Sequence, residues 1–189
     1  MQTTTAFSPN NSQGESSMVL TRLFFVLSTA VLLFGCASQS KTADQLRDNV
    51  KRNVTFSSRE VFEVKKPYRQ VSDTLRKKWL ECLDSTATGS IHRGGNTFGT
   101  LTNIYKPKVA VTDRRTELTL QHKQTGAGVT QLGGPPPEGF FIIVTDVYPA
   151  DKNTSRVDVQ KHMPGYAGVM KAIRNWAEGT SMACPDLAQ

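Results

Sequence analysis

The run Phe140-Phe141-Ile142-Ile143-Val144 decides the fold of this chain, because it is continuously apolar and rich in β-branched and aromatic residues. Such a run is typical of a strand at the centre of a sheet. The strand pattern continues to Tyr148, and the turn-forming cluster Pro149–Asn153 then leads into a second strand pattern over Thr154–Gln160. A short turn between two strands predicts an antiparallel hairpin.

Three other segments predict strands. Glu60–Val64 is β-branched and aromatic, as strands that pack on a core are. Phe98–Tyr105 and Val109–His122 follow a period of two, with a kink expected at residues 113–115 of the second segment.

Two segments predict helices with one apolar face. The first begins after Pro67, and its apolar residues recur at steps of three and four: Tyr68, Val71, Leu75, Trp79, Cys82 and Leu83. The second begins after Pro164, ends before Gly179 and shows the same steps: Tyr166, Val169, Met170, Ile173, Trp176 and Ala177. We interpret both stripes as core-packing faces.

The order strand, helix, four strands, helix favours an α+β fold. We expect a single domain over residues 54–189, in which an antiparallel sheet of about five strands carries both helices on one face. The glycine-rich segments Ser90–Asn96 and Gln124–Gly139 predict loops. Neither joins a strand to a helix with phosphate-loop spacing, so we expect no bound cofactor.

The N-terminal region has the pattern of an export signal. Arg22 precedes the apolar stretch Leu23–Phe34, which at about twelve residues is shorter than the roughly 20 that span a bilayer. The stretch ends in Leu33-Phe34-Gly35-Cys36, which resembles the lipobox of bacterial lipoproteins. That resemblance implies cleavage after Gly35, a diacylglycerol on the sulfur of Cys36 and an acyl chain on its amine. The alternative is an ordinary secreted protein in which Cys36 is incidental.

The resemblance also divides the N-terminal part of the chain. Residues 1–35 are expected to be the signal peptide, and the polar residues 1–17 suggest that translation begins at Met18. Residues 36–53 are expected to be a lipidated tether with at most one frayed helical turn, able to extend ~50 Å from the membrane. In the sorting rule of Gram-negative lipoproteins, Ala37 after the modified cysteine implies the outer membrane, with the domain facing the periplasm.

With Cys36 lipidated, Cys82 and Cys184 remain in a compartment that permits disulfides. We predict that they pair, and the alternative is two separate buried thiols. No metal-ligand spacing of cysteines occurs, and His92, His122 and His162 stand singly in different predicted elements. We therefore expect no metal site.

The chain is basic, with a formal net charge of +7. A solvated surface explains the small groups of lysine and arginine, and contact with anionic envelope material is the alternative. No dense basic tract is interleaved with aromatic residues, and export argues against nucleic acid as a partner.

The segment Gly179-Thr180-Ser181-Met182-Ala183 resembles the sequence around the nucleophile of subtilisin-like serine proteases. That chemistry needs a histidine as the general base and an aspartate that orients it. In that family the serine also lies at the start of a helix. Here Ser181 follows a predicted helix, and no matching histidine segment occurs. We interpret the match as chance and expect no catalytic residues.

These features predict a non-enzymatic envelope lipoprotein whose domain binds a protein or an envelope polymer in the periplasm. The element order is also similar to the helix-grip domains of BamC, the accessory lipoprotein of outer-membrane barrel assembly. The alternative is a carrier that encloses a small apolar ligand, with Gln124–Gly139 as a lid. An immunity-type lipoprotein that blocks a toxin is a third hypothesis. A large cavity under the long helix would favour the carrier, and a filled interior would favour the binding module.

Overall fold

The computed structural model describes residues 39–93, 96–126 and 135–187, which belong to one compact unit that spans Gln39–Gln189. The predicted signal peptide and Cys36 therefore lie outside the described residues.

The described residues confirm an α+β fold with an antiparallel sheet. Six strands lie in the order β1-β6-β5-β4-β3-β2. Their bounds are β1 (Ser57–Val64), β2 (Ser85–Arg93), β3 (Asn96–Val111), β4 (Thr116–Gly126), β5 (Phe140–Pro149) and β6 (Ser155–His162). The predicted hairpin of β5 and β6 is confirmed, and the apolar run of β5 lies in the interior of the sheet, between β6 and β4.

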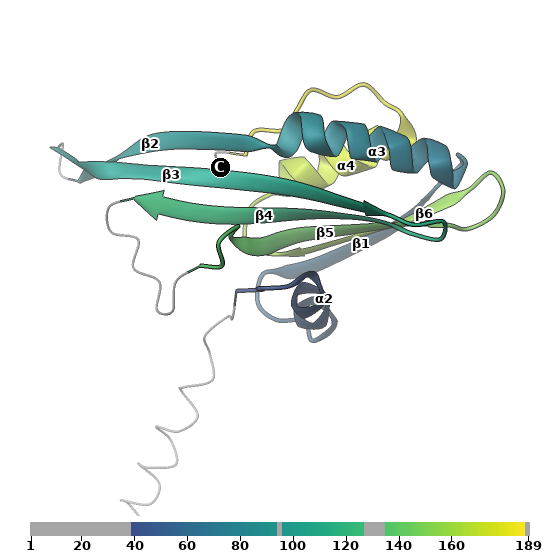
Figure 1. The fold of residues 1–189 in the computed structure, drawn as a ribbon, viewed down its shortest axis with the longest axis horizontal. Helices are drawn as coiled ribbons and strands as arrows, with labels where there is room; N and C mark the ends of the chain where they lie inside the picture. The colour runs from purple at the N-terminus through teal and green to yellow at the C-terminus, as the bar shows by residue number, and fades with distance from the viewer. Residues whose placement is uncertain (1–38, 94–95, 127–134, 188–189) are drawn as a thin grey trace, which may run out of the picture. The chain divides into compact units, whose positions relative to one another are not determined.

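Helices cover both faces of this sheet. The two predicted helices, α3 (Tyr68–Leu83) and α4 (Ala167–Glu178), pack on one face, which we call the upper face, and α2 (Ala43–Lys51) packs on the opposite, lower face (Figure 1). Helix α4 ends at Gly179, whose φ of 75° is a left-handed conformation that glycine adopts at little cost.

The main core lies between the upper face and its two helices. Trp79 of α3 and Trp176 of α4 are 0% and 2% exposed, and they pack with buried side chains of the central strands such as Leu118, Leu120 and Val157. A smaller cluster on the lower face joins Leu46 and Val50 of α2 to Val144 and Phe141 of β5. The apolar stripes of α3 and α4 are thus core-packing faces, as predicted.

Helix α2 corrects the expectation of two helices. Residues 43–51 form a nine-residue helix rather than an extended tether with one frayed turn. The Thr42 hydroxyl accepts a hydrogen bond from the Gln45 amide at 3.1 Å, and the Gln45 side chain accepts one from the Lys41 amide at 2.8 Å. This capping arrangement begins the helix, and the burial of Leu46 and Val50 holds it on the sheet.

Strand β2 corrects the strand count from about five to six. Most of the expected loop Ser90–Asn96 belongs instead to β2 and β3, which pair from Ser85 opposite Tyr105 to Arg93 opposite Asn96. Residues 94 and 95 lie outside the described part of the chain. The residues of β2 are mostly small and polar, and the strand has no apolar face. Its period of two therefore cannot be recognised as an apolar pattern in the sequence.

The expected kink at residues 113–115 is the turn between β3 and β4. The Thr112 amide donates to the Arg115 carbonyl at 2.8 Å, which closes this turn. Strand β3 also continues without interruption through Lys106-Pro107-Lys108, where the sequence pattern placed a break. The expected loop Gln124–Gly139 begins with the end of β4, and its residues 127–134 lie outside the described part of the chain.

Candidate functional site

Buried side chains of α3 pack against buried side chains of the sheet. Trp79 donates its indole N–H to the Thr119 carbonyl at 3.0 Å, and Trp176 donates to the Met182 carbonyl at 3.5 Å. Both large rings are therefore buried with their polar atoms satisfied.

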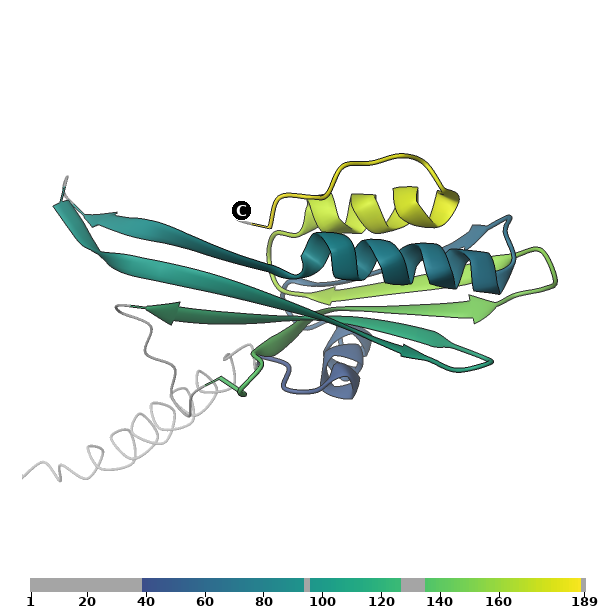
Figure 2. The same ribbon diagram turned by 45° about the horizontal axis from the view of Figure 1, so that its top comes forward.

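The first candidate surface is the free edge of β2. This strand lies at the end of the strand order, so one side of its backbone has no neighbouring strand among the described residues. The β2–β3 hairpin also runs out past the ends of α3 and α4 (Figure 2). Ser85–His92 carries no lysine, arginine or carboxylate, and Thr86, Thr88, Gly89 and Ser90 are exposed. Free N–H and C=O groups with small uncharged side chains form a template for pairing with another strand.

The opposite edge of the sheet is β1, and its chemistry is different. Arg59, Glu60 and Glu63 place charges along this strand. Arg59 binds Asp158 at 2.9 Å, and Glu60 accepts a hydrogen bond from Arg174 at 2.8 Å. Charged side chains on an edge strand disfavour pairing with a further strand. Of the two edges, β2 is the one that is open to an added strand.

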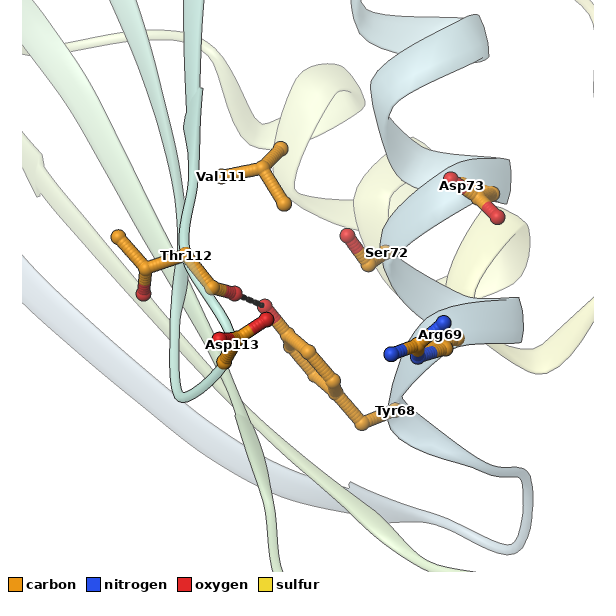
Figure 3. A pocket seen from close by; sticks show the side chains of 7 residues that line it. All are labelled: Tyr68, Arg69, Ser72, Asp73, Val111, Thr112 and Asp113. Atoms are coloured by element: carbon orange, nitrogen blue, oxygen red, sulfur yellow. Dashed lines mark hydrogen bonds between the residues drawn. The ribbon is translucent and has the colours of Figure 1, made fainter.

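A second candidate surface is a groove of about 560 Å³ between α3 and the β3–β4 turn. Figure 3 shows Tyr68 reaching from α3 to the turn, where its hydroxyl donates to the Thr112 carbonyl at 2.8 Å. Seven residues line the groove: Tyr68, Arg69, Ser72, Asp73, Val111, Thr112 and Asp113.

The chemistry of this groove suits polar contacts. The buried Ser72 hydroxyl lies 2.5 Å from the Thr116 hydroxyl, and the Tyr68 hydroxyl lies 2.8 Å from the same atom. The exposed rim carries Arg69 with Asp73, and Val111 is 55% exposed. Hydroxyl groups that are already paired and charges of both signs can hold a polar partner.

The lower face carries a buried ion network centred on Arg47 of α2. Arg47 binds Asp146 of β5 at 3.0 Å and Glu117 of β4. Burial alone would lower the pKa of Arg47, but the hydrogen bond to Glu117 and the charges of Asp146 and Glu117 raise it above its usual value. Burial also raises the pKa of the Asp146 carboxyl, against the attraction of Arg47. This network fixes α2 on the sheet.

A cluster of rings lies on the upper face beside the C-terminal segment. His122 stacks on Tyr105, with 4.7 Å between ring centroids, and one ring nitrogen lies 3.0 Å from the Asn103 side-chain oxygen. Tyr105 donates to the Leu187 carbonyl at 2.5 Å, and Tyr166 meets Tyr105 edge to face. Burial lowers the pKa of His122 and raises the pKa of Tyr166, so both rings are neutral at pH 7.

The sequence-predicted site residues lie in several places. A disulfide joins Cys82 and Cys184, as predicted, and ties the end of α3 to the segment after α4. Ser181 lies exposed in that segment, beyond the end of α4. The lipidation site Cys36 lies outside the described residues.

The three histidines lie on β2, β4 and β6, where His92 is exposed and His162 is buried against the Ser57 hydroxyl at 2.8 Å. Within the described ranges, no three residues of the types His, Cys, Asp and Glu are placed to hold a metal ion. None of the helices in the described part of the chain combines the length and apolarity needed to cross a membrane.

Sequence reasoning missed both candidate surfaces. It left Ser85–Gly89 unassigned and interpreted the β3–β4 turn as a kink within one strand. The available signal for β2 is the row of hydroxyl residues at Thr86, Thr88 and Ser90, of which Thr88 lies opposite Thr102 and Ser90 opposite Thr100 in β3.

Comparison with models of known protein families and with curated protein sequences finds no match. Solved structures with a partial likeness include a conserved protein from Geobacillus kaustophilus, at 14% identity and a TM-score of 0.33 over 64% of this chain and 89% of that one. A START superfamily protein from Mycobacterium smegmatis has 10% identity and a TM-score of 0.29, over 65% of this chain and 94% of that one. Ara h 8.0201 has 15% identity and a TM-score of 0.32, with the same coverage. Similarities this low assign neither a family nor a function.

Proposed function

We propose that this protein is a non-enzymatic lipoprotein of the bacterial envelope that binds an extended segment of a partner protein along β2. The lipid on Cys36 holds the chain at the outer membrane, and the domain faces the periplasm. Residues 37–42 then connect the lipid to helix α2.

The open edge of β2 is the observation that supports this proposal. An added strand gains main-chain hydrogen bonds along Ser85–His92, and the small residues Thr86, Thr88 and Gly89 do not obstruct its approach. The burial of both Trp79 and Trp176 in the packed core supports surface binding rather than the carrier hypothesis.

A photo-crosslinking amino acid at Thr86 tests the binding surface in intact cells. We expect one discrete adduct with a partner protein, identified by mass spectrometry. Thr88→Lys places a charge on the edge and should reduce that adduct at least fivefold, because charged edge residues oppose strand pairing.

The matched control is Val61→Lys on β1, where the side chain is 42% exposed at the opposite edge. It adds the same charge and should leave the Thr86 adduct unchanged. An adduct that survives Thr88→Lys, or no adduct at Thr86, would contradict the proposal. An apolar ligand released from the purified, denatured protein would instead favour the carrier hypothesis.

The lipid anchor is tested separately. Globomycin, which blocks the lipoprotein signal peptidase, should shift the electrophoretic mobility of the protein, and Cys36→Ser should abolish incorporation of radiolabelled palmitate. Unchanged mobility together with no palmitate incorporation into the native chain would exclude the anchor.

A further inference from the structure

A hollow of about 570 Å³ lies between the outer side of α4 and the strands β1 and β6. It is open to solvent, and α4 contributes Met170, Lys171 and Arg174 to its wall. Strand β1 contributes Ser58, Arg59 and Glu60, and β6 contributes Lys161. The lining therefore contains four cations and one carboxylate.

Two of these four cations are held by carboxylates. Arg59 pairs with Asp158, whose carboxylate lies outside the lining of the hollow, at 2.5 Å. Arg174 pairs with Glu60, and its guanidinium also lies 4.1 Å from the centre of the Phe62 ring. These contacts fix both arginines, because their hydrogen bonds and ring contact restrict the side chains.

The other two cations, Lys161 and Lys171, form no ion pair with any residue in the described ranges. Lys161 is half-buried, and its ammonium donates to the Met163 carbonyl at 2.8 Å. An ammonium has three donors, so two of the Lys161 donors remain for another acceptor. Burial lowers the pKa of Lys161, because no carboxylate offsets its loss of hydration.

We propose that this hollow binds a phosphate-bearing ligand, with Lys161 and Lys171 contacting the phosphate oxygens. A phosphate monoester carries a charge of about −1.5 to −2 at pH 7, which matches the two positive charges of Lys161 and Lys171. Lysine binds phosphate as a point charge, whereas the planar guanidinium groups of Arg59 and Arg174 are already paired with carboxylates. The hollow adjoins β1, at the opposite edge of the sheet from β2, so this site does not depend on the proposed partner surface.

Titration of the ¹⁵N-labelled full chain in neutral detergent with inorganic phosphate tests the site by NMR. We expect saturable shifts at the amides of Gly165 and Ala167, which line the hollow. The variant Lys161→Gln/Lys171→Gln should weaken phosphate binding at least tenfold. Lys171→Gln alone changes an exposed side chain, keeps the fold and should weaken binding at least threefold.

The charge-matched control is Lys77→Gln/Lys152→Gln, which removes two exposed lysines from α3 and from the β5–β6 turn. It should bind phosphate within twofold of the native chain. No saturable shift at Gly165 and Ala167, or an equal loss in both double variants, would overturn the proposal, because net charge alone would then explain the binding.

Glycerophosphoglycerol, the soluble headgroup of phosphatidylglycerol, distinguishes the source of the phosphate. Tighter binding of this diester than of inorganic phosphate assigns the site to a lipid headgroup. Tighter binding of inorganic phosphate assigns it to a free phosphate monoester. Either result supports the proposed site. If no Thr86 crosslink is found, the proposed partner surface fails, but the results expected from the titrations with inorganic phosphate and glycerophosphoglycerol stay the same.

Discussion

The two faces of the sheet are stabilised in different ways. On the upper face, α3 and α4 bury a continuous apolar core that includes both tryptophans. On the lower face, α2 buries the apolar side chains of Leu46 and Val50 against β5, and Arg47 adds ion pairs to Asp146 and Glu117. The upper face therefore gains free energy from apolar area, and the lower face depends on a few directed polar contacts.

The two kinds of contact have different consequences for the stability of the domain and for the position of α2. Burial of apolar surface is not directional, so it drives the upper layer together without fixing each detail. Buried ion pairs lose much of their attraction to desolvation, but they hold the paired groups in one geometry. We infer that the upper core supplies the stability of the domain and that the Arg47 network sets where α2 lies.

The largest expected effect is on the upper face. Trp79→Ala removes a fully buried ring from the middle of α3 and should lower the free energy of unfolding by about 3–5 kcal/mol, through lost burial and the cavity left behind. Urea denaturation monitored by circular dichroism measures the loss.

The control for this change is the neighbouring residue Leu80, which is 49% exposed on the same helix. Leu80→Ala should change the free energy of unfolding by less than about 0.5 kcal/mol. Equal losses in the two variants would contradict the assignment of stability to the upper core.

The same contrast explains how much of the fold the sequence predicts. The stripes of α3 and α4 and the apolar run of β5 are predictable, because their periods report burial directly. Helix α2 has Leu46 and Val50 as its buried apolar residues, so its apolar face is too short to recognise, and its position on the sheet depends on the distant residues Asp146 and Glu117.

Strand β3 shows a further limit of sequence reasoning. Pro107 suggests a break, since proline cannot donate to a sheet ladder. Strand β2, however, ends its pairing at Tyr105, so Pro107 lies beyond the β2 ladder and the sheet tolerates it.

Both candidate surfaces were missed because exposed polar residues show no periodic pattern of burial in the sequence. The groove and the open edge are defined only by the residues that lie next to each other in the folded chain.

The second expected effect concerns the lower face. Arg47→Met leaves the Asp146 carboxylate, with 3% of its side chain exposed, without its main partner. We expect a loss of about 2–3 kcal/mol in the free energy of unfolding, because charged hydrogen bonds are lost and the raised pKa of Asp146 lets protonation offset part of the cost.

The double variant Arg47→Met/Asp146→Leu sharpens the comparison. Glu117 keeps Arg115 as a partner at 3.0 Å, so the double variant leaves no buried charge unpaired. Its free energy of unfolding should return to within about 1 kcal/mol of the native value, since apolar replacements of buried ion pairs are often neutral. A double variant no more stable than Arg47→Met would show that the network itself stabilises the fold and would break the contrast between the faces.

The smallest effect is a pH dependence that the upper face contributes through His122. Burial lowers its pKa below the ordinary 6.5, so the unfolded chain takes up this proton more readily than the folded one. The contribution of His122 to the free energy of unfolding is therefore complete above about pH 6.5 and is lost as pH falls below it, by at most ~1.4 kcal/mol per pH unit.

Urea unfolding between pH 7.5 and 5.5 measures this loss. The free energy of unfolding should fall less steeply with falling pH for His122→Asn than for the native chain. His92→Asn removes an exposed histidine and should keep the native slope, whereas equal slopes in all three proteins would mean that His122 titrates alike in both states.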